Sequence, residues 1–229
     1  MITNQNDLYD YLIKRGATRL CHFTKIKSFV HILNSNSGIL ATNSIPLDVK
    51  AQNDLCRCDG NLDYICCSIE YPNSWYWGKV KERDDDVIFR DWVILCIDLD
   101  ILKYQKIKFS PCNAAFGNGR YIKEKISEFS TLFDTIINIQ GKIRQRTSEM
   151  LTCCPTDDQA EILVHTNVLW RYINCVIVGN ESTAENIYAI LKTCHKKLNI
   201  IIAPDVCNTR WSFLVRRGLR PIEEKYNVM

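Results

Sequence analysis

The stretch that most constrains the fold of this chain is residues 92–98, Trp-Val-Ile-Leu-Cys-Ile-Asp. It is almost continuously apolar and bounded by polar residues, which is typical of a strand inside a protein core. Shorter predicted strands lie at residues 19–23, 64–69, near 107, 161–164, 173–178 and 199–203. The chain is therefore expected to build a sheet from segments spread along most of its length.

Apolar residues at helical spacing separate these strands. They predict helices at 7–15, 25–34 and 181–198, with shorter helical pieces between 121 and 133. Thr24 is expected to cap the second helix and Ser182 the last one. Residues 72–77, Pro-Asn-Ser-Trp-Tyr-Trp, are expected to form an aromatic turn, and residues 43–62 a long surface loop.

The order of these elements argues against two common nucleotide-binding folds. Strands and helices do not alternate regularly, no G-x-G-x-x-G follows a strand, and G-x-x-x-x-G-K-[ST] is absent. An α+β fold with a mixed, strongly bent sheet fits better. A length of 229 residues suits one domain spanning 1–229.

Composition excludes several classes of protein. Apolar residues make up 46% and charged residues 24%, which is ordinary for a globular domain. The polar N-terminus is unlike a signal peptide, and no window holds the ~20 apolar residues that a membrane helix needs. A cytoplasmic protein is expected, with its twelve cysteines reduced. None of the paired cysteines has zinc-ligand spacing, so no metal site is expected.

Two segments combine residue types that could bind a ligand. His22 and Thr24 lie two residues apart on a predicted strand, so their side chains share one face. The alternative for His22 is a structural histidine. Arg57 lies in the polar loop Asn-Asp-Leu-Cys-Arg-Cys-Asp-Gly, and its planar guanidinium suits a phosphate or carboxylate. The alternative there is an ordinary surface loop.

A third segment is the sharpest of the three. The turn Pro-Thr-Asp-Asp-Gln-Ala delivers Glu161 to the first position of an apolar strand. A carboxylate placed in this way can stabilise positive charge that develops in a neighbouring cleft. The alternative is a surface glutamate on an edge strand.

Together the three segments resemble the DarT family, enzymes that attach ADP-ribose to bases of single-stranded DNA. The resemblance is carried by His22-Phe-Thr24 and the helix after it, by the Arg57 loop and the strand after it, and by Asn113-Ala-Ala115. Its most specific part is residues 157–164, Asp-Asp-Gln-Ala-Glu-Ile-Leu-Val. It spans roughly residues 19–180 and preserves the order of the motifs. The Arg57 loop is more similar to the branch of the family that modifies guanine than to the thymine branch.

The resemblance implies an ADP-ribosyltransferase (PARP-like) fold, with two facing bent sheets, flanking helices and a cleft for NAD. His22 and Thr24 would then hold a ribose and the amide of NAD. Arg57 would contact the phosphates or assist proton transfer. Glu161 would bind the 2′-hydroxyl of the nicotinamide ribose and stabilise the oxocarbenium-like transition state. Such a reaction requires one well-placed carboxylate and no metal.

The resemblance also implies a single-stranded DNA acceptor and a toxin–antitoxin setting with a macrodomain partner that reverses the modification. Residues 144–159 would select the acceptor. Arg144 and Arg146 are candidates to contact the strand, and Trp75 and Tyr76 to stack on bases, with Phe116 and Tyr121 as further aromatic candidates. The alternatives are the same fold with a protein, RNA or water acceptor, or a catalytically inactive nucleic-acid-binding module.

Overall fold

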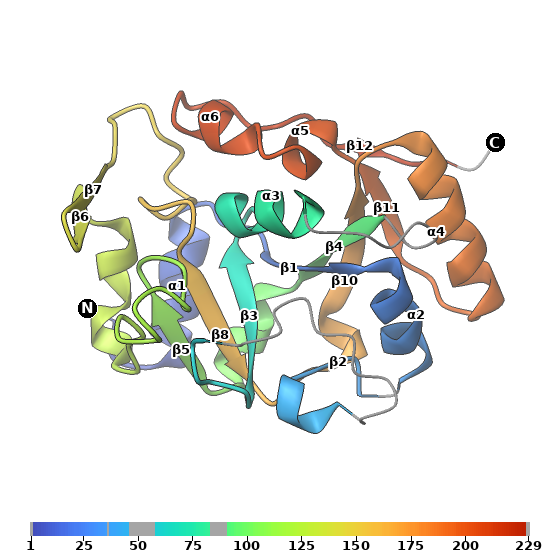
Figure 1. The fold of residues 1–229 in the computed structure, drawn as a ribbon, viewed down its shortest axis with the longest axis horizontal. Helices are drawn as coiled ribbons and strands as arrows, with labels where there is room; N and C mark the ends of the chain where they lie inside the picture. Colours follow the sequence, from blue (N-terminus) through green and yellow to red (C-terminus); the bar gives the residue numbers. More distant parts are fainter. Residues whose placement is uncertain (1, 36, 46–57, 83–90, 228–229) are drawn as a thin grey trace.

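A large mixed sheet organises the computed structural model, which describes residues 2–35, 37–45, 58–82 and 91–227 (Figure 1). Within these residues eight strands follow the order β12-β11-β10-β4-β1-β3-β8-β5. They are β1 (Leu20–Lys25), β3 (Tyr64–Ile69), β4 (Trp92–Ile97), β5 (Ile107–Ser110), β8 (Glu161–His165), β10 (Ile173–Val178), β11 (Asn199–Ile202) and β12 (Glu224–Lys225). Among the described pairs β10 and β11 are parallel and the others antiparallel, so the predicted α+β class and mixed sheet are confirmed.

The sheet bends where β1 meets β3. These strands share only two residue pairs, Leu20 with Ile69 and Cys21 with Ser68, whereas β1 and β4 pair along their full length. In Figure 1, β3 and β8 run across the direction of β1 and β4. The two sheets expected from sequence are therefore two halves of one continuous sheet.

The predicted core strand is β4, between β1 and β10. Each of its residues is buried, and Val93–Ile97 has no measurable exposure. Burial on both faces accounts for its continuous apolar sequence.

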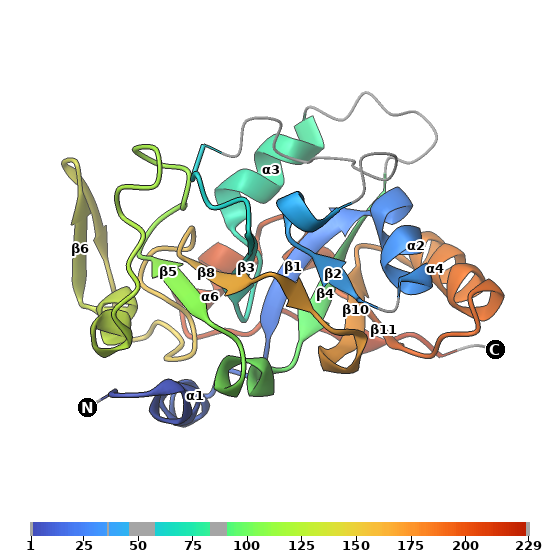
Figure 2. The same cartoon turned by 90° about the horizontal axis from the view of Figure 1, so that it is seen from below.

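Helices and small strand pairs surround the sheet (Figures 1 and 2). The α-helices are α1 (Gln5–Lys14), α2 (Ile26–Asn34), α3 (Ser74–Glu82), α4 (Glu181–Thr193), α5 (Pro204–Cys207) and α6 (Trp211–Val215). The 3₁₀ helices are η1 (Thr42–Ser44), η2 (Leu99–Lys103), η3 (Ile126–Phe133) and η4 (Trp170–Tyr172). Two short pairs complete the fold: β2 (Ile39–Leu40) with β9 (Asn167–Val168), and the hairpin of β6 (Ile136–Ile139) and β7 (Lys142–Gln145). No helix among the described residues is long and apolar enough to cross a membrane.

Four local predictions were wrong. Thr24 stays within β1, and α2 begins after Lys25 without a side-chain cap. Helix α4 is capped by Asn180 in place of Ser182, and it ends at Thr193, before residue 198. The expected aromatic turn is the beginning of α3, where the Asn73 side chain accepts a hydrogen bond from the Tyr76 N–H. The β6–β7 hairpin was not predicted.

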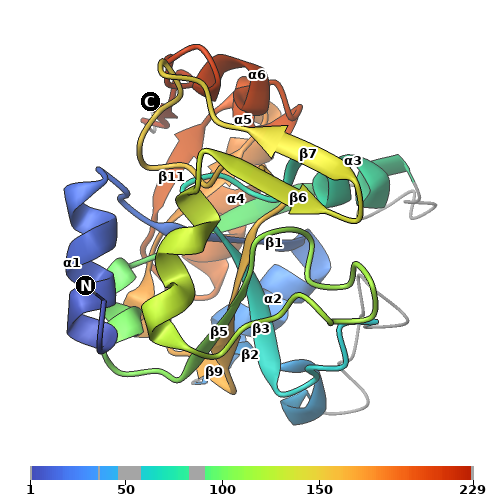
Figure 3. The same ribbon diagram turned by 90° about the vertical axis from the view of Figure 1, so that its left-hand side faces the viewer.

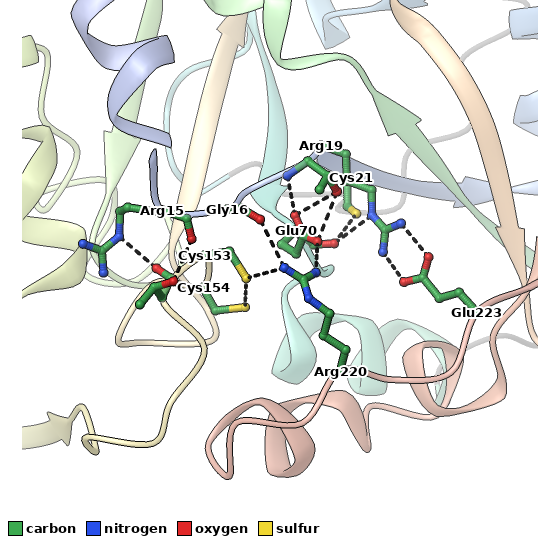
Figure 4. Close-up of polar contacts among 11 residues, drawn as sticks. Arg15, Gly16, Arg19, Cys21, Glu70, Cys153, Cys154, Arg220 and Glu223 are labelled. Carbon is green, nitrogen blue, oxygen red and sulfur yellow. Dashed lines mark hydrogen bonds and ion pairs between the residues drawn. The ribbon is translucent and has the colours of Figure 1, made fainter. Parts of the chain in front are cut away.

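A polar network joins the ends of the chain to the junction of the two half-sheets (Figure 4). The Glu70 N–H donates to the Arg19 carbonyl, and Arg19 Nε donates to the Glu70 carbonyl, both at 3.0 Å. The Glu70 carboxylate is buried and accepts from Arg220 Nη1 at 2.8 Å and from the Thr18 N–H at 2.7 Å. Arg19 Nη1 also binds Glu223 at 2.7 Å. This set is called the terminal network below.

Candidate active site

Glu161 lies at the first position of β8, between β3 and β5, and only 6% of it is exposed. Asn73 Nδ2 donates to its Oε1 at 2.9 Å, and the Ala114 N–H donates to its Oε2 at 2.8 Å. Both carboxylate oxygens thus accept hydrogen bonds that fix their orientation. The alternative of a surface glutamate is excluded.

Asn73 connects that carboxylate to helix α3. It is fully buried, its Oδ1 accepts from the Tyr76 N–H at 3.0 Å, and its carbonyl accepts from the Trp77 N–H at 2.9 Å. One side chain therefore caps a helix and donates to Glu161. The sequence interpretation missed this residue, although an asparagine before a helical Ser-Trp-Tyr-Trp stretch is an N-cap signal.

His22 and Thr24 project from β1, in the other half of the sheet. His22 Nδ1 lies 2.9 Å from the Cys66 carbonyl. A carbonyl can only accept, so this contact places a proton on Nδ1, and Nε2 of the neutral ring is an acceptor. Thr24 is buried two residues further along the strand.

His22, Thr24 and Glu161 line one cavity of about 570 Å³. That volume is within the usual range for small-molecule sites, about 300–1,000 Å³. Its walls come from β1, α2, the β2–η1 segment, β3, the first turn of α3, and residues 113–115. Arg57 lies outside the described residues, but Asp59, two positions later, is buried in the same wall. Among the residues that the structure describes, no group of His, Cys, Asp or Glu could hold a metal ion.

Comparison with known proteins gives the family of this chain. The family described as "ssDNA thymidine ADP-ribosyltransferase, DarT" matches residues 21–208. The chain belongs to the DarT family. A search of curated protein sequences gives no significant match.

Solved DarT structures share the fold. Thermus sp. 2.9 DarT in complex with ADP-ribosylated ssDNA matches with a TM-score of 0.59 and 15% identity, over 82% of this chain and 95% of that one. The same enzyme in complex with NAD+ gives 0.57 and 17%, over 82% and 96%. Thermosipho africanus DarTG in complex with ADP-ribose gives 0.57 and 18%, over 83% of this chain and 51% of that one. The expected ADP-ribosyltransferase fold is thus confirmed.

Two of the aromatic residues expected to contact DNA, Trp75 and Tyr76, lie at the start of α3. Trp75 and Tyr76 both line the cavity, and Trp75 is 51% exposed. Tyr76 is half-buried and packs on Phe23, with ring centroids 5.7 Å apart. Phe116 and Tyr121 stack on each other with ring centroids 6.0 Å apart, and neither is among the residues that line the cavity.

The two candidate arginines occupy different environments on and after β7. Arg144 Nε lies 3.6 Å from Asp157 Oδ2, and its side chain is partly exposed. The Arg146 guanidinium donates to the carbonyls of Cys154 and Leu151. Arg146 therefore holds the loop that leads to Glu161. Arg144 lies beside that loop, next to Asp157.

Burial raises the pKa of two groups, Asp157 in this loop and Cys112. It raises the pKa of Asp157 to about 6, against the opposing effects of a hydrogen bond from the Gln159 N–H and of Arg144. Burial also raises the pKa of Cys112 to about 11, and the charges of Asp157 and Glu161 add to that shift. The Cys112 thiol therefore stays protonated at neutral pH, and it lies near both carboxylates.

Proposed function

We propose that this chain transfers one ADP-ribose unit from NAD to a base of single-stranded DNA, with Glu161 as the catalytic carboxylate. Membership of the DarT family supports the reaction, and NAD is its ADP-ribose donor. The assignment of Glu161 is carried by its buried carboxylate, which two hydrogen bonds hold in place. Glu161 lines the same cavity as His22 and Thr24.

The chemistry requires one bond to break and one to form. The C1′–N bond to nicotinamide breaks, nicotinamide leaves as a neutral molecule, and positive charge develops on the ribose. A fixed carboxylate stabilises that charge without reorganising during the reaction. A base nitrogen then bonds to C1′ and loses its proton, and Glu161 accepts that proton in this proposal.

The other cavity residues orient the donor in this proposal. His22 and Thr24 bind the ribose and amide groups of NAD, because both face the cavity from β1. Arg57 binds the diphosphate or assists proton transfer. Asp59, two residues later, is buried and lines the cavity.

The acceptor strand is proposed to lie at the rim of the same cavity. Trp75 and Tyr76 offer stacking surfaces, and Arg144 offers a charge for a phosphate. Arg146 contributes through the loop that it holds. The family description names thymidine, whereas the Arg57 loop is more similar to the guanine branch, so both bases are candidates.

The biological setting is part of the proposal. A cytoplasmic toxin with a macrodomain antitoxin is expected, and the structural match to a DarTG protein in complex with ADP-ribose supports a partner of this type.

The test compares the wild type with Glu161→Gln, which preserves size but removes the charge. We expect mass spectrometry to show one added ADP-ribose on a thymine- or guanine-containing oligonucleotide. Loss of a stabilising contact in an active site typically costs about 10²–10³ in rate, and Glu161→Gln should lose at least that. Glu185→Gln, which removes an exposed charge on α4, should behave as wild type.

Two results would contradict the proposal. Full activity in Glu161→Gln would remove that residue from catalysis. Release of nicotinamide by a wild-type protein that leaves every oligonucleotide unmodified would keep the NAD site and exclude DNA as the acceptor.

A further inference from the structure

Residues 209–220, called the C-terminal segment below, follow the part of the chain that the DarT family matches. This segment contains α6, which packs against the loop between β7 and β8 (Figure 3). The Leu151 N–H donates to the Val215 carbonyl at 3.1 Å, and Thr147 Oγ1 donates to the Arg216 carbonyl at 2.9 Å. The loop that delivers Glu161 is therefore supported by residues outside the matched region.

The loop and the C-terminal segment also contact each other at both ends of α6. The Ser212 hydroxyl donates to the Asp158 carboxylate, only three residues before Glu161. At the other end Gly218 has φ +74°, and a Cβ there would lie 2.8 Å from the Glu149 carbonyl oxygen. The loop and the C-terminal segment thus pack against each other from Ser212 to Gly218.

Arginines from both sides of this contact lie beside the loop that leads to Glu161. Arg144 Nε of β7 lies 3.6 Å from Asp157 Oδ2, and the positive charges of Arg144 and Arg216 both oppose the rise that burial causes in the pKa of Asp157. Arg216 Nη1 also lies 3.4 Å from the Gln145 carbonyl oxygen, beside the hairpin. The neighbouring Asp158 accepts from two hydroxyls. Arg144 and Arg216 are both partly exposed.

An aromatic ring with a cation lies on the same segment. Phe213 is 52% exposed, and the Arg217 guanidinium carbon lies 3.9 Å from its ring centroid. Single-stranded nucleic acids are bound by exposed rings on which bases stack, together with cations that follow the phosphates. Phe213 and Arg217 offer both features.

We propose that the C-terminal segment is part of the acceptor site and binds the phosphodiester backbone of single-stranded DNA through Arg216 and Arg217, with Phe213 as a stacking surface. Arg144 and Arg216 form the inner part of this contact, and Phe213 with Arg217 the outer part. The inference rests on the proposed DNA acceptor. It extends the surface that binds DNA beyond residues 21–208, the part of the chain that the family matches.

The test measures oligonucleotide binding by fluorescence anisotropy at several salt concentrations, and NAD cleavage without DNA. Arg216→Ala and Arg217→Ala should each weaken binding several-fold for every oligonucleotide sequence. Each lost phosphate contact should reduce the salt slope of log K by about 0.7. Nicotinamide release without DNA should match the wild type. Arg216→Lys should retain most of the affinity, because a lysine still offers a charge to a phosphate.

Arg171→Ala is the matched control, since it removes an exposed arginine from η4. Wild-type affinity and salt slope in both Arg216→Ala and Arg217→Ala would overturn the inference. Equal loss of NAD cleavage and DNA binding in Arg216→Ala would overturn it as well, because the segment would then only support the loop. A wild type that cleaves NAD but binds no oligonucleotide would instead contradict the DNA acceptor itself.

Discussion

At Asn73 one side chain caps α3 and donates to Glu161, so a substitution can separate the two roles. Asn73→Asp keeps an oxygen for the Tyr76 N–H but places a second carboxylate next to the first. Two carboxylates at hydrogen-bond distance do not both ionise readily, so the pair should share a proton near neutral pH. We expect DNA modification to fall at least ~10-fold, with NAD binding and helix stability largely retained.

The pH profile makes this prediction specific. Activity of Asn73→Asp should rise toward a higher pH than that of the wild type, because Glu161 must ionise beside a like charge. Asn73→Ser, which keeps a capping oxygen without adding charge, should lose activity without that shift. An unchanged pH profile in Asn73→Asp would show that Asn73 only caps the helix.

Asp157 allows a stability prediction with a defined sign. Burial raises its folded-state pKa from 3.8 to about 6, so the folded protein keeps a proton that the unfolded chain has already lost. The free energy of unfolding attributable to this group therefore falls as pH rises from about 4 to about 6. Asp157→Asn lacks this titration. Its stability relative to wild type should increase by up to about 3 kcal/mol over that interval.

Urea denaturation at pH 4, 5, 6 and 7 measures the difference directly. Asp10→Asn, which removes an exposed carboxyl group of α1, is the control. A constant difference for Asp157→Asn would mean that Asp157 titrates normally in the folded protein.

At the scale of elements, the cavity wall depends on the link from α2 to β2. Gly38 has φ +70°, and a Cβ there would lie 2.1 Å from the Val168 carbonyl oxygen of β9. Gly38→Ala should therefore separate β2 from β9 and reduce the free energy of unfolding by at least about 2 kcal/mol, with weaker NAD binding. Gly141→Ala is the control: φ is +80° but nothing lies within 4 Å, so only about 1 kcal/mol should be lost. Equal losses in chemical denaturation would refute the role of close packing at Gly38.

The elements that sequence predicted well are those whose own pattern decides their structure. Residues 92–97 are apolar because β4 is buried on both faces, and Glu161 begins β8 as expected. The start of α3 was misread because its two tryptophans and tyrosine resemble an aromatic turn until Asn73 is recognised as the cap. The partners of Glu161 could not be predicted, because Ala114 acts through its backbone N–H and tertiary packing brings it there.

At the scale of the molecule, the proposed active site lies where the two halves of the sheet meet. His22 and Thr24 come from β1 in one half and Glu161 from β8 in the other, so their spacing depends on how the halves are joined. The strands β1 and β3 supply only two residue pairs at that junction. The terminal network extends it, because Arg19 precedes β1 and Glu70 follows β3. The ends of the chain therefore help to hold the two sides of the cavity together.

Arg220→Ala tests this role. It leaves the buried Glu70 carboxylate with Thr18 as its remaining described partner and also removes the contact of Arg220 with the Gly16 carbonyl. Because Arg220 is half-exposed, we expect a loss of about 1–2 kcal/mol, or a Tm lower by roughly 2–8 °C. Arg217→Ala lies three residues earlier and should leave Tm within about 1 °C while weakening DNA binding. Arg220→Ala should show the reverse, a lower Tm with unchanged affinity for single-stranded DNA. If the two variants had the same effect on both measurements, Arg220 and Arg217 would not have the separate roles assigned to them.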